Sequence, residues 1–150
     1  MKDVVSGLGG VFVYSDQPER LTGWFEECFG LIFEKLGDSS THYTTFWAPD
    51  SANPGHRLDT TLAIMRSKTG LPRPKKNQDP GDMYGDQHFM VNLRVRDLDA
   101  LVESLQARGE TILGRQDEGE YGLFAWLCDP DGNRIELYEP RHGSQSAAEQ

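Results

Sequence analysis

The sequence has 150 residues, of which 37% are hydrophobic, and 24 acidic against 15 basic residues give a formal charge of -9. This length is sufficient for one domain with its own core. An acidic surface repels phosphate backbones and anionic lipids, so we expect neither a nucleic acid nor a membrane as partner. Cys28 and Cys128 show no metal-ligand or disulfide spacing, and the lack of a recognisable leader or long apolar run predicts a cytoplasmic protein.

The first half of the sequence predicts a strand, a helix and three further strands. Asp16 is the expected helix N-cap, because the following Pro18 suits the first helical turn. Gly30 is the expected helix end. The apolar residues of the helix recur with helical spacing at Leu21, Trp24, Phe25 and Cys28. The strands are expected at residues 9–14, 31–36, 42–47 and 60–65.

The second half of the sequence repeats this pattern. A strand is expected at residues 89–95, and Asp97 caps a helix that ends at Gly109. The helix presents an apolar face made of Leu98, Leu101, Val102 and Leu105. Strands follow at residues 111–115, 123–128 and 134–138. Two βαβββ repeats are therefore predicted, and the two capping aspartates give an offset of 81 residues.

A long polar segment separates the repeats. Residues 67–87 contain Pro72, Pro74 and Pro80, which predicts a mobile connector or a lid over a site. We expect one domain at residues 8–140, with the first repeat at about 8–66 and the second at about 88–140. The small, polar residues 141–150 are expected to form a disordered tail.

The most informative segment lies near the end of the sequence. Asp129-Pro130-Asp131-Gly132 predicts a tight turn, and the β-forming residues on either side complete a hairpin. Together with Asn133 and the triplet Ile135-Glu136-Leu137, this segment resembles the closing hairpin of the vicinal oxygen chelate superfamily. That superfamily includes glyoxalase I, bleomycin-resistance proteins and extradiol dioxygenases. The resemblance implies an α+β fold in which two βαβββ repeats form an incomplete β-barrel with an internal cleft and the helices outside.

The resemblance also implies where a metal ion would bind. Metal-using members place one His, Glu or Gln ligand on each of four strands, and Glu136 matches the fourth ligand. The matching positions in the other strands are Gly9, Met90 and a segment, residues 60–65, that offers only Thr, Leu, Ala, Ile and Met. We therefore expect no cofactor. A divalent metal held by Glu136 with His88 is the alternative, because His88 shares a strand face with Met90.

The same hairpin suggests a binding site for a small molecule. Alternation along the last strand places Arg134, Glu136 and Tyr138 on one face. The resemblance to thiol-transferase members implies that Trp126 points inward. Glu136 is the expected catalytic residue, and the expected ligand-binding residues are Asn92, Arg94, Phe124, Trp126, Arg134 and Tyr138. The structural alternative is that the aromatic residues form core and that Glu136 pairs with Arg94 or Arg134.

Three functions fit these residues. The first is a metal-free, bleomycin-resistance-type protein that binds a flat or cationic small molecule among aromatic side chains. The second is a metal-independent isomerase or lyase in which Glu136 is the general base. The third is a divalent-metal enzyme with a displaced site.

Association is the last expectation from the sequence. The segment 41–47 combines β-forming residues with aromatic side chains, and an unpaired strand edge of this kind is usually covered in proteins. Because two-fold pairing is the commonest closed arrangement of one chain type, we expect a homodimer with Phe46 and Trp47 near the subunit contact or the pocket mouth.

Overall fold

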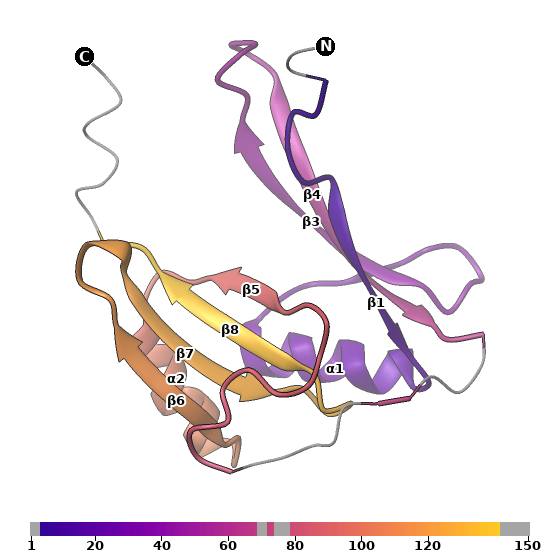
Figure 1. Ribbon diagram of the computed structural model, residues 1–150. Helices are drawn as coiled ribbons and strands as arrows, with labels where there is room; N and C mark the ends of the chain where they lie inside the picture. The colour runs from indigo at the N-terminus through magenta and orange to yellow at the C-terminus, as the bar shows by residue number, and fades with distance from the viewer. Residues whose placement is uncertain (1–3, 69–71, 74–78, 142–150) are drawn as a thin grey trace. The chain divides into compact units, whose positions relative to one another are not determined.

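The computed structural model describes residues 4–68, 72–73 and 79–141, which fall into two compact units divided after residue 71 (Figure 1). Each unit has the order strand, helix and three strands, so the predicted α+β fold of two βαβββ repeats is confirmed. Neither four-stranded sheet closes into a barrel. Within the described residues, no helix has the length and apolar composition needed to cross a bilayer. The predicted tail lies outside the described residues except for Arg141, and so do connector residues 69–71 and 74–78.

The first unit is a mixed sheet with one helix. Its elements are β1 (Gly10–Ser15), α1 (Pro18–Phe29), β2 (Glu34–Lys35), β3 (His42–Pro49) and β4 (Arg57–Arg66). The strand order is β1-β4-β3-β2, with β1 parallel to β4 and the other pairs antiparallel. β2 is shorter than the expected strand at 31–36, whereas β4 extends beyond the expected 60–65 at both ends.

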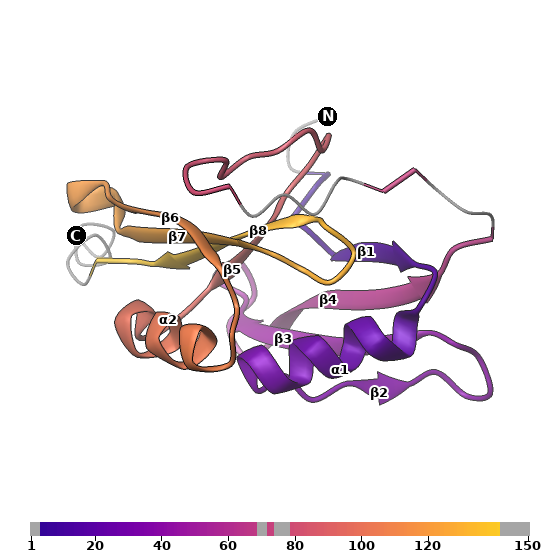
Figure 2. The same ribbon diagram turned by 90° about the horizontal axis from the view of Figure 1, so that it is seen from below.

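The helix α1 packs on one face of this sheet (Figure 2). The buried face of α1 includes Leu21 and Phe25, each only 1% exposed, whereas Trp24 is half-buried. On the sheet, the register partners Val13 and Ile64 are both buried beneath the helix. Burial of such apolar side chains is the main term that stabilises the unit.

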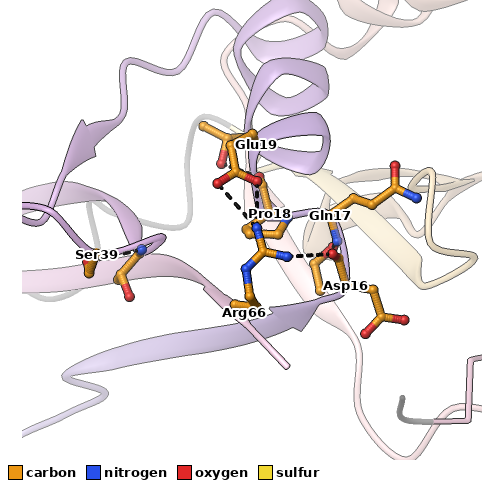
Figure 3. Close-up of polar contacts among 9 residues, drawn as sticks. Asp16, Gln17, Pro18, Glu19, Ser39 and Arg66 are labelled. Atoms are coloured by element: carbon orange, nitrogen blue, oxygen red, sulfur yellow. Dashed lines mark hydrogen bonds and ion pairs between the residues drawn. The ribbon is translucent and has the colours of Figure 1, made fainter. Parts of the chain in front are cut away.

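The start of α1 differs from the prediction. The N-cap is Gln17, not Asp16, because Pro18 occupies the first helical position. The Ser15 hydroxyl accepts a hydrogen bond from the Gln17 amide at 3.0 Å. Figure 3 shows Arg66, at the end of β4, donating to the Asp16 carbonyl at 2.9 Å and to the Glu19 carboxylate at 3.1 Å. The turn before α1 is therefore fixed by Ser15 and by a residue 50 positions away.

The second unit has the same architecture. It contains β5 (Val91–Arg94), α2 (Leu98–Ala107), β6 (Ile112–Asp117), the 3-10 turn Gly119–Tyr121, β7 (Leu123–Cys128) and β8 (Arg134–Glu139). The strand order is β5-β8-β7-β6, with β5 parallel to β8. The Asp97 carboxylate accepts a hydrogen bond from the Ala100 amide at 2.9 Å, which confirms the predicted N-cap. The Glu139 carboxylate accepts a second one from the Leu98 amide at 2.6 Å.

These helix starts correct the register of the internal repeat. Because α1 begins at Pro18 and α2 at Leu98, the halves are offset by 80 residues, one fewer than predicted. The buried helix positions then coincide in three pairs: Pro18 with Leu98, Thr22 with Val102, and Phe25 with Leu105.

The closing turn forms as the sequence predicts. The Asp129 carboxylate accepts hydrogen bonds from the Asp131 amide at 2.9 Å and from the backbone and side-chain amides of Asn133 at 2.8 Å. Gly132 has a φ of 89°, which favours glycine. Burial raises the pKa of Asp129 to about 6, while the hydrogen bonds from Asn133 act in the opposite direction. At pH 7.5 the carboxylate is therefore mostly ionised, as its acceptor role requires.

Candidate functional site: the face of the second sheet opposite α2

The helix α2 and the candidate site lie on opposite faces of the second sheet. Ala125, Leu127 and Leu137 are fully buried at 0% exposure on the α2 side. Side chains alternate along a strand, so Trp126 and Glu136 lie on the other face. The register places Asn92 of β5, Glu136 of β8 and Trp126 of β7 side by side across the sheet.

Hydrogen bonds hold Glu136 from both neighbouring strands. One carboxylate oxygen accepts from the Asn92 side-chain amide at 2.5 Å, and the other accepts from the Trp126 indole N–H at 2.9 Å. Each oxygen keeps a further lone pair, because a carboxylate accepts about four hydrogen bonds. Glu136 is therefore a pre-oriented acceptor, and it forms no ion pair with Arg94 or Arg134 in the described structure. The structural alternative of a Glu136–arginine pair is wrong.

Two further aromatic rings, Phe124 and Tyr138, lie beside this row. The Phe124 ring stacks on Tyr138 with centroids 5.0 Å apart and planes 20° apart, and on Trp126 at 6.1 Å and 18°. Trp126 is only 2% exposed, whereas Phe124 and Tyr138 are half-buried. By strand alternation all seven predicted site residues lie on this face, Arg94 and Arg134 included. Hydrogen bonds and ring contacts join five of them: Asn92, Phe124, Trp126, Glu136 and Tyr138.

The connector supplies two residues that sequence reasoning missed. Residues 79–87, here called the strap, lie against the second sheet, where the Gly81 amide donates to the Leu113 carbonyl at 2.7 Å. The Tyr84 ring meets the Trp126 indole edge-on at 5.9 Å and remains 56% exposed. The Met83 thioether lies where a side chain at Gly114 would be. Met83-Tyr84 is an apolar pair inside a polar segment, and this was the available signal.

Arg134 holds the strap. Its side chain is 2% exposed and donates to the Asp82 carboxylate at 2.7 Å and to the Asp82 carbonyl at 3.3 Å. Gly85, with φ of 62°, approaches so closely that a Cβ there would lie 3.0 Å from the guanidinium carbon. The Gln87 side chain bonds the Arg134 backbone at both its N–H and its carbonyl. Arg134 therefore anchors the strap, although the sequence suggested that it contacts a ligand.

The family of the protein follows from comparison with known proteins. The family model for the glyoxalase/bleomycin resistance protein/dioxygenase superfamily matches residues 7–137. The chain belongs to this superfamily. A search of curated proteins found no match.

Solved structures agree with this membership. One similar structure is the antibiotic binding protein TnmS3 from Streptomyces sp. CB03234, with 25% identity, coverage of 93% of this chain and 99% of that chain, and a TM-score of 0.60. A glyoxylase/bleomycin resistance protein/dioxygenase domain from Frankia sp. EAN1pec is 20% identical over 91% and 99%, with a TM-score of 0.55. The fosfomycin resistance protein FosX from Listeria monocytogenes is 13% identical over 90% and 91%, with a TM-score of 0.58. The last two show the fold alone.

The donor set of this superfamily member does not fit a metal ion. With the corrected repeat offset, the first ligand position is Gly10 rather than Gly9, and its second-repeat equivalent is still Met90. The first-repeat equivalent of Glu136 is Ala63, so Glu136 is the single oxygen donor among the four positions. Its hydrogen-bonded neighbours Asn92 and Trp126 direct N–H groups at the carboxylate, and the indole has no lone pair for a cation. His88 is exposed, and no cluster of three or more His, Cys, Asp or Glu exists among the described residues.

Proposed function

We propose that the protein binds a flat organic small molecule on the face of the second sheet opposite α2, without a metal ion. The observation that carries this proposal is the fixed Glu136 carboxylate beside the stacked rings of Phe124 and Tyr138. Rings supply stacking area for a planar ligand, and an oriented acceptor supplies direction and selectivity. The exposed ring of Tyr84 adds a fourth aromatic group that would contact the same ligand.

The most informative comparison supports a binding role. TnmS3 is described as an antibiotic binding protein and is 25% identical over nearly the whole chain. A planar antibiotic is therefore the first ligand class to test. The formal charge of -9 would attract a cationic member of that class at long range.

Tryptophan fluorescence tests this proposal directly. Protein treated with a chelator is titrated with planar polycyclic antibiotics, and Trp126 emission is isolated by comparison with a Trp126→Phe variant. A Trp24→Phe variant is the matched control, because the Trp24 ring packs against Phe25 and Phe29 of its own helix α1. We expect saturable quenching that persists without metal and is lost in Trp126→Phe. Lack of any saturable signal and of any thermal shift across the panel would contradict the proposal.

Metal-independent catalysis is the second candidate function. Each Glu136 oxygen keeps a lone pair after its hydrogen bond, so the carboxylate can accept a proton from a bound carbon acid in an isomerase or lyase reaction. Glu136→Gln should then abolish turnover while ligand binding persists. Equal turnover of both proteins would remove Glu136 from any catalytic role.

We also propose that the protein is a homodimer. β2 pairs only with His42 and Tyr43 of β3, so residues 44–49 have no strand neighbour on that side among the described residues of the unit. Phe46 and Trp47 lie there, 42% and 59% exposed. A partner that covers this edge would remove an aggregation-prone surface. Light scattering should give twice the 16.9 kDa of one chain, and a monomer mass would overturn the proposal.

A further inference from the structure

Arg94 is one of several arginines of this acidic protein that form no ion pair with a carboxylate among the described residues. Other arginines do form ion pairs with a carboxylate, among them Arg66, Arg73, Arg115, Arg134 and Arg141. Among the described residues the Arg94 side chain forms neither an ion pair nor a hydrogen bond, and it is exposed. The Arg20 and Arg96 side chains also form no ion pair there, and Arg94 differs from them by its position on β5. An unpaired cation in a protein of formal charge -9 is available for an anionic group from outside.

The position of Arg94 relates it to the candidate site. Arg94 lies on β5 two residues after Asn92, so both side chains are on the same face of the sheet. Asn92 donates one amide hydrogen to Glu136, and its second amide hydrogen has no acceptor in the described structure. Arg94 is also the register partner of Tyr138, whose ring stacks on Phe124.

We propose that Arg94 is a specificity residue that binds an acidic group, a carboxylate or phenolate, of the planar ligand. This inference rests on the proposed function and names the chemistry of its ligand. With the planar body of the ligand on Tyr138 and Phe124, the acidic group lies over β5. There it receives hydrogen bonds from the Arg94 guanidinium and from the second amide hydrogen of Asn92.

The charges around Arg94 are consistent with this role. Glu136 is the carboxylate nearest in register on this face, and its charge repels an anion, so the Arg94 guanidinium must supply the larger, attractive contribution. Asp82 is bonded to Arg134. The net negative charge slows the approach of any anion but is screened beyond about 8 Å at physiological salt. Arg94 therefore sets which planar ligand is retained, rather than how fast ligands arrive.

A matched ligand pair tests the assignment. Anthraquinone-2-carboxylate and anthraquinone-2-carboxamide have the same planar body and differ in charge. Wild-type protein should bind the carboxylate about tenfold more tightly at physiological salt, as expected for a charge-assisted hydrogen bond that is partly exposed. Arg94→Gln should remove the preference without weakening carboxamide binding, and Arg94→Lys should restore part of it. Arg96→Gln is the control, because Arg96 lies beyond the end of β5 and should keep the full preference.

The outcomes separate the two proposals. If both compounds bind wild type equally, or if Arg94→Gln keeps the preference, the assignment of Arg94 is overturned while the binding function stands. If neither compound nor any other planar ligand binds, the proposed function fails and the assignment falls with it. A carboxylate preference that disappears in Arg94→Gln and remains in Arg96→Gln supports both.

Discussion

The two halves of the protein share a backbone plan and differ in the chemistry of equivalent positions. In the second unit, Asn92, Glu136 and Trp126 form a hydrogen-bonded row across the sheet. In the first unit, the same row by register is Phe12, Ala63 and Tyr43. Phe12 is 56% exposed, and the Tyr43 hydroxyl is directed to Glu34, to which it donates at 2.8 Å. A repeated fold therefore fixes where side chains stand, while the residue types decide which half carries an oriented acceptor.

The largest expected effect on stability comes from introducing a carboxylate equivalent to Glu136 into the first unit. Ala63 is 3% exposed and has no donor comparable to Asn92 or Trp126 in its row. Ala63→Glu would bury an unpaired carboxylate, and we expect the free energy of unfolding to fall by about 4 kcal/mol. Urea denaturation measures it, with Ala48→Glu as the exposed control on β3. Equal stability of the two variants would show that the first unit accommodates a carboxylate at this position as well as the second unit does.

The strap is the second difference between the halves, and Arg134 tests it. Arg134→Ala removes a guanidinium that is 2% exposed, takes the ion-pair partner from Asp82 and releases the strap. We therefore expect the free energy of unfolding to fall by about 3 kcal/mol. The environment of Trp126 should change as well, as measured by near-ultraviolet circular dichroism. Arg115→Ala, which removes an exposed pair with Asp99, should change stability by less than about 0.5 kcal/mol. Comparable losses in both variants would mean that Arg134 has no special role.

Gly10 and Gly9 allow a direct comparison of two glycines at the first metal-ligand position, of which only one has room for a side chain. A Cβ at Gly10 would lie 2.6 Å from the Thr61 carbonyl oxygen of β4, whereas a Cβ at Gly9 has nothing within 4 Å. We expect Gly10→Ala to lower the free energy of unfolding by about 2 kcal/mol, because β1 and β4 must separate. Gly9→Ala should be neutral or slightly stabilising. Thermal unfolding of the two variants measures this difference. If Gly10→Ala unfolds at the wild-type temperature, a side chain fits at this position.

The smallest expected effect is at Glu136 itself. In Glu136→Gln the side-chain NH₂ group faces one of the two donors, Asn92 or Trp126, so one hydrogen bond is lost. We expect a loss of about 1 kcal/mol in urea denaturation and a shift in Trp126 emission. Glu103→Gln, on the exposed face of α2, is the control and should leave both unchanged. An unaltered Trp126 emission spectrum in Glu136→Gln would show that the indole N–H does not donate to Glu136 in solution.

The sequence by itself determined the local features of this protein. The Asp97 cap, the turn around Asp129 and the helix end at Gly30 all depend on groups within a few residues, so their chemistry is readable from neighbours. Strand alternation also placed Glu136 and Trp126 on one face before their hydrogen bond was seen. The cap at Asp16 was wrong because proline at the first helical position outweighs the preference of a carboxylate for the cap.

Only the tertiary structure decided the contacts between distant segments. Arg134 pairs with Asp82, 52 residues away, and Tyr84 reaches Trp126 from a segment whose composition predicts no packing. No periodic pattern in the sequence predicts either contact, because each depends on how a loop packs across a sheet that has already formed. The corrected offset of 80 residues likewise needed the observed helix starts. The sequence thus specified which side chains share a face, and the folded sheet specified which of them are already engaged and which, like Arg94, have no side-chain partner among the described residues.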